Sequence, residues 1–75
     1  MNSTPATPNQ PEYLPHQQRV VTERTELEEK LGKLRSFFNT STYAGLDEAE
    51  QDRLNEQADI MDRYRAILGE RIAAF

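Results

Sequence analysis

Residues 47–75, DEAEQDRLNEQADIMDRYRAILGERIAAF, decide the fold of this 75-residue chain. Apolar side chains recur there in alternating steps of four and three residues, with one arginine in the row: Leu54, Ala58, Met61, Arg65, Leu68, Ile72 and Phe75. Such a repeat gives an α-helix one continuous face that packs along a second helix. Asp47 is a favoured N-cap residue type and acidic residues follow it, so we expect a helix over about residues 47–74.

The partner helix precedes this stretch. Its own row of apolar residues has the same helical spacing, again with one slot filled by an arginine: Val20, Arg24, Leu27, Leu31, Leu34 and Phe38. Pro15 suits the first helical position, which predicts a helix over about 15–39, and the turn-forming residues of 40–46 predict a loop. Two helices with a short connection predict an all-α fold, an antiparallel, coiled-coil-like two-helix hairpin over residues 15–75. Residues 1–14 contain three prolines and one charge, so we expect a flexible, disordered arm there.

A second apolar row lies one step round the helix of residues 47–74 and comprises Ile60, Tyr64, Ile67 and Ala74. A hairpin can bury only one row of each helix, so this additional row predicts a homo-oligomer. We expect the interface to include the following residues: Val21, Phe37, Ile60, Tyr64 and Ile67. The alternative is a monomer in which the N-terminal arm covers the second row.

Composition argues against several classes of function. The chain has no cysteine and His16 is its one histidine, so we expect no disulfide, no metal site, no cofactor and no catalytic nucleophile–base pair. The formal net charge of −4 and the pI of about 4.9 argue against direct binding of nucleic acid. The sequence has neither a secretory signal nor an apolar run long enough to span a membrane. We therefore expect a cytoplasmic protein that is not an enzyme.

Arg24 and Arg65 each occupy a slot where the row of the helix calls for an apolar residue. An antiparallel hairpin brings the two guanidinium groups to about one level, where they repel each other unless an anion lies between them. Glu28 and Asp62, or carboxylates of a second subunit, can supply that anion. Alternatively, the pair binds a phosphate or carboxylate of a ligand, with Tyr64 stacking on a base. Both interpretations remain open at this point.

The chain also contains the segments HQQRVV (16–21), ELEEKL (26–31) with Lys33-Leu34, and LGERIAAF (68–75). Together these segments resemble a widespread family of very short phage and prophage proteins that are described by similarity to an open reading frame of a crAss-like phage. The resemblance covers residues 16–75. It implies a phage accessory protein that acts in the cytoplasm of the host cell, and such genes frequently encode inhibitors of host defence.

Gln10-Pro11-Glu12 followed by Tyr13, ahead of a helical hairpin, resembles the arm of the hairpin sponge proteins by which phages sequester cyclic nucleotide signals of the CBASS and Thoeris defence systems. This architectural likeness implies an oligomer that binds phosphates between subunits, and it adds Tyr13 to the candidate ligand residues. We therefore expect a non-enzymatic protein that counteracts host defence by binding a nucleotide-type signal, such as a cyclic nucleotide. The alternative is an inhibitor or adaptor that binds a host defence protein or a phage protein through an exposed helix face, Tyr13-Leu14 or the loop at Tyr43.

Overall fold

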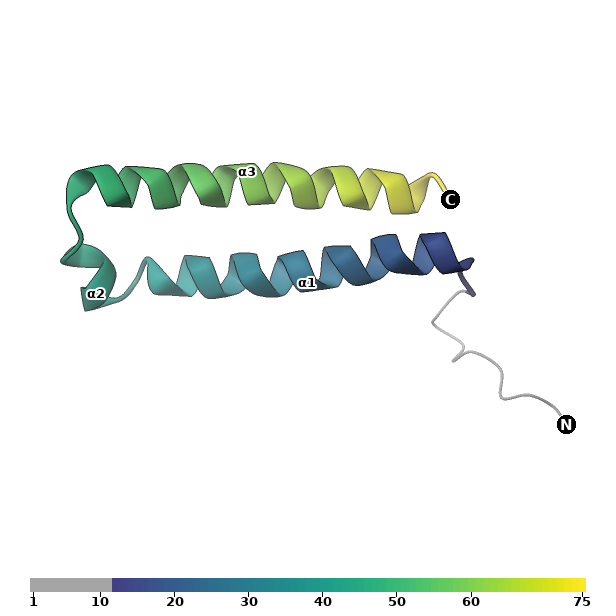
Figure 1. The fold of residues 1–75 in the computed structure, drawn as a ribbon, viewed down its shortest axis with the longest axis horizontal. Coiled ribbons are helices and arrows are strands. Elements are labelled where there is room, and N and C mark those ends of the chain that lie inside the picture. Colours follow the sequence, from purple (N-terminus) through teal and green to yellow (C-terminus); the bar gives the residue numbers. More distant parts are fainter. Residues whose placement is uncertain (1–11) are drawn as a thin grey trace, which may run out of the picture.

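The computed structural model describes residues 12–75, which form three helices: α1 (Pro15–Phe37), α2 (Ser41–Ala44) and α3 (Glu48–Ala73). Figure 1 shows α1 and α3 side by side and antiparallel, with α2 at the end where the chain reverses. The predicted all-α class is thus confirmed for the described part of the chain. Most of the predicted N-terminal arm, residues 1–11, lies outside the described residues.

Both long helices begin at residues whose chemistry favours a helix start. Pro15 is the first residue of α1, and the backbone N–H of Leu14 donates a hydrogen bond of 2.9 Å to Oε1 of Gln17. Asp47 caps α3, because its Oδ1 accepts a hydrogen bond of 2.8 Å from the backbone N–H of Glu50. Each cap satisfies a backbone donor that would otherwise have no partner within the structure.

The connection between the long helices differs from the predicted plain loop, because it contains the one-turn helix α2. Thr40 caps α2 by accepting a hydrogen bond of 3.2 Å from the backbone N–H of Tyr43. The Tyr43 ring then packs against Phe38, with ring centroids 5.0 Å apart, and its hydroxyl accepts a hydrogen bond of 2.8 Å from Nδ2 of Asn55. These contacts, which local propensity does not reveal, fold the turn and end α1 at Phe37 instead of the expected residue 39.

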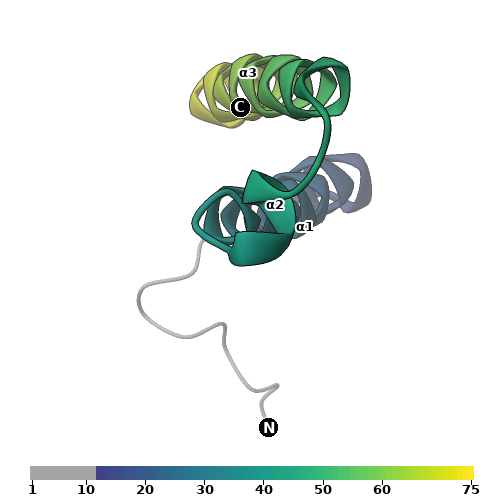
Figure 2. The ribbon, with the colours of Figure 1, turned by 90° about the vertical axis from the view of Figure 1, so that its left-hand side faces the viewer.

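The core is a single seam between α1 and α3. Its buried residues all come from the two predicted rows: Val20, Leu27, Leu31, Ala58 and Leu68. Leu31 and Leu68 are the most enclosed, at 1% and 0% exposure, and Met61 and Ile72 pack against the buried cluster. Figure 2, which looks along the pair from the α2 end, shows α3 lying along one side of α1. The remaining surface of both helices is therefore available to solvent or to a partner.

Candidate functional site

Arg24 of α1 and Arg65 of α3 converge on one carboxylate, that of Glu28. The Nε atom of Arg24 lies 3.5 Å from Oε2 of Glu28, and Nη1 of Arg65 lies 3.9 Å from the same oxygen. The two guanidinium groups therefore stand at one level of the helix pair, as the hairpin geometry predicted. Both side chains are about one-third exposed, at 35% and 31%.

A second carboxylate, that of Asp62, forms ion pairs with Arg65 and with a third arginine, Arg35. Arg65 donates two hydrogen bonds to Oδ1 of Asp62, 2.8 Å from Nη2 and 3.2 Å from Nε. Nη2 of Arg35, on α1, lies 3.3 Å from the same oxygen. The hydrogen bond from Arg65 is the largest cause of a lowered pKa of the Asp62 carboxyl; desolvation opposes it, and the charge of Arg65 and the contact with Arg35 lower the pKa further. Asp62 is therefore a firmly ionised member of the cluster at neutral pH.

Gly69 leaves the space in which the guanidinium of Arg24 lies. A Cβ atom at Gly69 would stand 3.3 Å from Cζ of Arg24 and 3.4 Å from its Nη2. The Nε atom of Arg24 is buried and, within residues 12–75, has no hydrogen-bond partner, since its approach to Glu28 at 3.5 Å is an ion pair without hydrogen-bond geometry. Arg24 thus retains unused capacity to donate a hydrogen bond.

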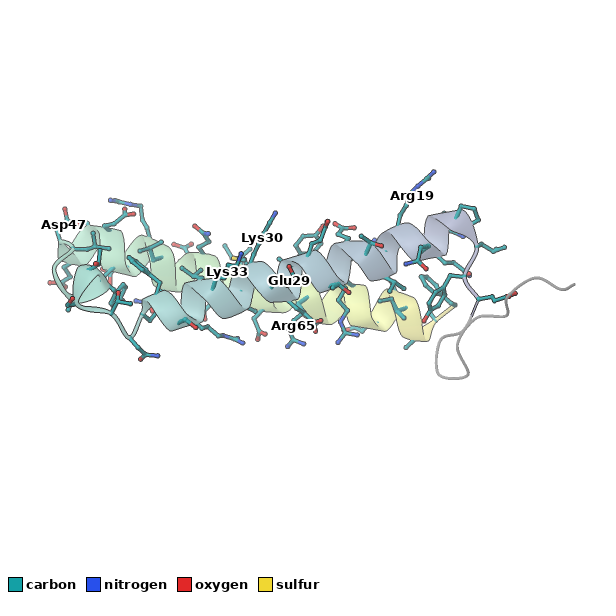
Figure 3. The ribbon with its side chains drawn as sticks, turned by 90° about the horizontal axis from the view of Figure 1, so that it is seen from below. Arg19, Glu29, Lys30, Lys33, Asp47 and Arg65 are labelled. Carbon is teal, nitrogen blue, oxygen red and sulfur yellow. The ribbon has the colours of Figure 1, made fainter. Side chains whose placement is uncertain are left out.

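An open surface pocket of about 390 Å³ lies beside this cluster and is lined by Glu28, Leu31, Gly32, Arg35 and Arg65. No atom comes within 4 Å of the position that a Cβ atom would take at Gly32, so the pocket is open at this residue. Its volume falls in the range of small-molecule pockets, about 300–1,000 Å³. Figure 3 places Arg65 at one long edge of the helix pair, with Arg19 and Lys30 at the opposite edge.

We call the cluster of Arg24, Glu28, Arg35, Asp62 and Arg65 the arginine edge. Its three guanidinium groups face two carboxylates, which leaves one excess positive charge and several unused N–H donors. Glu28 and Asp62 are 46% and 44% exposed, so a ligand in solution can reach both counter-charges. This arrangement is suited to holding a small anion, because guanidinium groups bind the oxygens of phosphate in pairs.

The two tyrosines predicted as ligand residues lie away from the arginine edge. Tyr64 directly precedes Arg65, but successive residues of a helix point about 100° apart, and Tyr64 is 42% exposed outside the seam. Tyr13 packs edge-on against Phe75, with ring centroids 5.8 Å apart. Phe75 follows Arg65 by ten residues, which places this contact about 15 Å further along the axis. The structure therefore brings Arg24 and Arg65 together without either tyrosine.

Arg35 is a member of the cluster that sequence reasoning missed. It lies outside the apolar row of its helix, so the pattern of a charge in an apolar slot does not identify it. A usable signal was present, because Arg24, Glu28 and Arg35 follow one another by four and seven residues and so share one helix face.

The residues predicted for the interface divide into two groups. Ile60, Tyr64 and Ile67 are exposed at 57%, 42% and 53%, and form a row along α3. Val21 and Phe37 are half-buried, and Phe37 packs edge-on against Tyr43 within the chain, with ring centroids 6.0 Å apart. Contact of these five residues with a second copy stays a prediction.

The described residues were also compared with the requirements of a metal site and of a membrane-spanning helix. Over residues 12–75, no group of three His, Asp or Glu side chains is placed to hold a metal ion. No helix of that part combines the length and the apolar character needed to cross a membrane.

Comparison with known proteins gives one finding. A family model described as Sequestin matches residues 14–74, a range that contains all three helices and the whole arginine edge. Neither a curated protein nor a solved structure matches the chain.

Proposed function

The chain belongs to the Sequestin family, and on that premise we propose that it is a binding protein that sequesters a small nucleotide-type ligand. The family description suggests binding rather than catalysis. The observation that carries the proposal is the convergence of Arg24, Arg35 and Arg65 on two carboxylates, next to an open pocket of about 390 Å³ that Arg35 and Arg65 line.

The chemistry of the arginine edge favours a phosphate as the group that is bound. Glu28 and Asp62 neutralise two of the three guanidinium groups. A phosphodiester carries one negative charge and two non-bridging oxygens, as a carboxylate does, so a phosphate of the ligand can take the place of a carboxylate opposite Arg35 and Arg65. Arg24 contacts Glu28, the same carboxylate that Arg65 approaches, so its guanidinium adds positive charge next to the same region. Arg24 and Arg65 are therefore proposed as phosphate contacts, joined by Arg35.

The biological role that we propose is the inhibition of host antiviral defence by a phage or prophage protein. A defence system that signals through a cyclic nucleotide fails when another protein binds the signal tightly before the receptor can bind it. Such a protein acts in the cytoplasm of the host cell and needs no catalytic group. We further propose that it works as a homo-oligomer, associating through Ile60, Tyr64 and Ile67 with a contribution from Phe37.

Calorimetric titration of the chain with cyclic dinucleotides, cyclic trinucleotides and cyclic ADP-ribose isomers tests this function. We expect one class of ligand to bind, and Arg65→Leu to abolish binding while the helical circular dichroism is retained. Arg53→Ala is the matched control, because Arg53 pairs with Glu50 of its own helix at 2.8 Å and is 67% exposed. The absence of binding across the whole panel would refute the proposal.

A second candidate function is that of an inhibitor or adaptor that binds another protein through an exposed apolar surface. The observation that favours it is the exposure of Leu14, at 57%, next to the pair formed by Tyr13 and Phe75. This candidate predicts that the chain captures one host protein reproducibly, that Leu14→Ser abolishes the capture, and that no nucleotide of the panel binds.

A further inference from the structure

The exposed apolar row of α3 lies on the opposite side of the core seam from the arginine edge. Ile60 and Ile67 each precede a residue of the core cluster, Met61 and Leu68, whereas Asp62 and Gly69 each follow one. Each step of one residue turns about 100° round the helix. The apolar row and the edge that holds Asp62 and Gly69 therefore flank the contact with α1 on two different sides.

The exposed row has the spacing of a coiled-coil seam. Ile60, Tyr64 and Ile67 are separated by steps of four and three residues, and Arg71 and Ala74 continue the same repeat. Their exposed fractions are 57%, 42% and 53% for the first three. Helices with this repeat pack on helices with the same repeat, and a second copy of α3 offers one.

Two charges on one flank of this row decide the direction of pairing. Arg63 and Glu70 are seven residues apart, about 10.5 Å along the helix, so they do not pair with each other. Neither belongs to an ion pair recorded within residues 12–75. When two helices pack antiparallel, this flank meets the same flank of the partner, so Arg63 comes close to Glu70 of the second copy. In a parallel pair in register, each residue would instead be level with its own copy.

We propose that α3 binds α3 of a second copy in an antiparallel, two-fold symmetric pair. Tyr64 of each copy packs against Ile67 of the other, and Ile60 packs on the aliphatic stem of Arg71 of the other. Two Arg63–Glu70 ion pairs flank these contacts. This geometry rests on the self-association included in the proposed function and adds its direction and register.

The pairing has a consequence for ligand binding. Because the arginine edge lies on the other side of the core seam, pairing through the apolar row leaves both pockets open. Each copy then carries a complete site of its own, built from α1 and α3 of one chain. The dimer binds two ligands independently and none at its two-fold axis.

Charge reversal tests the geometry, with the oligomeric state measured by sedimentation equilibrium over a range of concentrations. We expect Arg63→Glu alone and Glu70→Arg alone each to raise the dimer dissociation constant about tenfold, since each turns two attractions into two repulsions. The double variant restores the wild-type constant to within about twofold. Arg19→Glu is the matched control for net charge, because Arg19 lies at the surface of α1 (Figure 3), and it leaves the constant unchanged.

Three results would overturn the inference: a monomeric wild type, single reversals without effect, or a double variant that remains dissociated. Calorimetric titration of the same proteins with pyrophosphate separates this inference from the proposed function. Arg63→Glu should bind pyrophosphate as the wild type does, because its site lies within one chain. A wild type that dimerises but binds neither pyrophosphate nor any nucleotide of the calorimetric panel would refute the proposed function and leave the pairing intact.

Discussion

Alanine at Gly69 should stabilise the protein less than alanine at Gly32, although both glycines lie inside long helices. Replacing a helix-interior glycine with alanine is favourable by about 0.8–1 kcal/mol. At Gly32 the new methyl group meets no atom within 4 Å, so we expect the whole of that gain. At Gly69 the methyl group would lie 3.3 Å from Cζ of Arg24, and the guanidinium must shift by a few tenths of an ångström. Because Glu28 also holds Arg24, we expect about half of the gain, roughly 0.5 kcal/mol.

Thermal unfolding followed by circular dichroism at 222 nm measures this difference. In a domain of this size, about 1 kcal/mol corresponds to about 4–8 °C in Tm, so Gly32→Ala should raise Tm by that amount and Gly69→Ala by about half. The control is the same pair of substitutions in an Arg24→Ala background, where the two gains should become equal. Equal gains in the wild-type background would refute the placement of the Arg24 guanidinium over Gly69.

Three other substitutions test the core, the acid response and the turn. Leu68→Ala truncates a side chain that is 0% exposed and should lower the free energy of unfolding by about 2–5 kcal/mol, so a cooperative thermal transition should be lost. An unchanged Tm would contradict the burial of Leu68 in the core. Asp62→Asn should make the fall of Tm below about pH 3.8 less steep. The pKa of Asp62 in the folded chain lies below its usual value of 3.8, so its charge stabilises the fold above that pH, and this stabilisation is lost as the pH falls through the lowered pKa. An unchanged dependence of Tm on pH in this acid range would refute the pairing with Arg65. Tyr43→Phe removes the hydrogen bond of 2.8 Å from Asn55 and should lower stability by about 0.5 kcal/mol in urea titration, whereas no change would show that the bond does not hold the turn.

The helix pair could be predicted because its signals are periodic and local. The rows that contain Leu31 and Leu68 repeat over several turns, and the two residues are the most buried of the described chain. Pro15 and Asp47 likewise determine helix starts through their own backbone and side-chain chemistry. The meeting of Arg24 with Arg65 followed from the same register, because in an antiparallel hairpin equal steps from the turn bring residues together.

The features that escaped prediction depend on contacts between distant residues. α2 forms because Tyr43 packs on Phe38 and accepts a hydrogen bond from Asn55, twelve residues later. Arg35 joins the arginine edge through Asp62 of the other helix, and no pattern within α1 alone names that partner. Tyr64 directly precedes Arg65, and adjacent residues of a helix point about 100° apart, so stacking of Tyr64 on a bound base stays a prediction. Sequence pattern therefore predicts the seam better than the two edges beside it.

If the proposed function is right, the arginine edge holds an intact nucleotide-type ligand. Equilibrium dialysis against the ligand that binds most tightly in the calorimetric panel, followed by heat release and mass spectrometry of the released ligand, tests it most directly. We expect about one ligand per chain, recovered chemically unchanged, and no retention by a variant that lacks both Arg35 and Arg65. Recovery of a converted product, or equal retention by that variant, would contradict it.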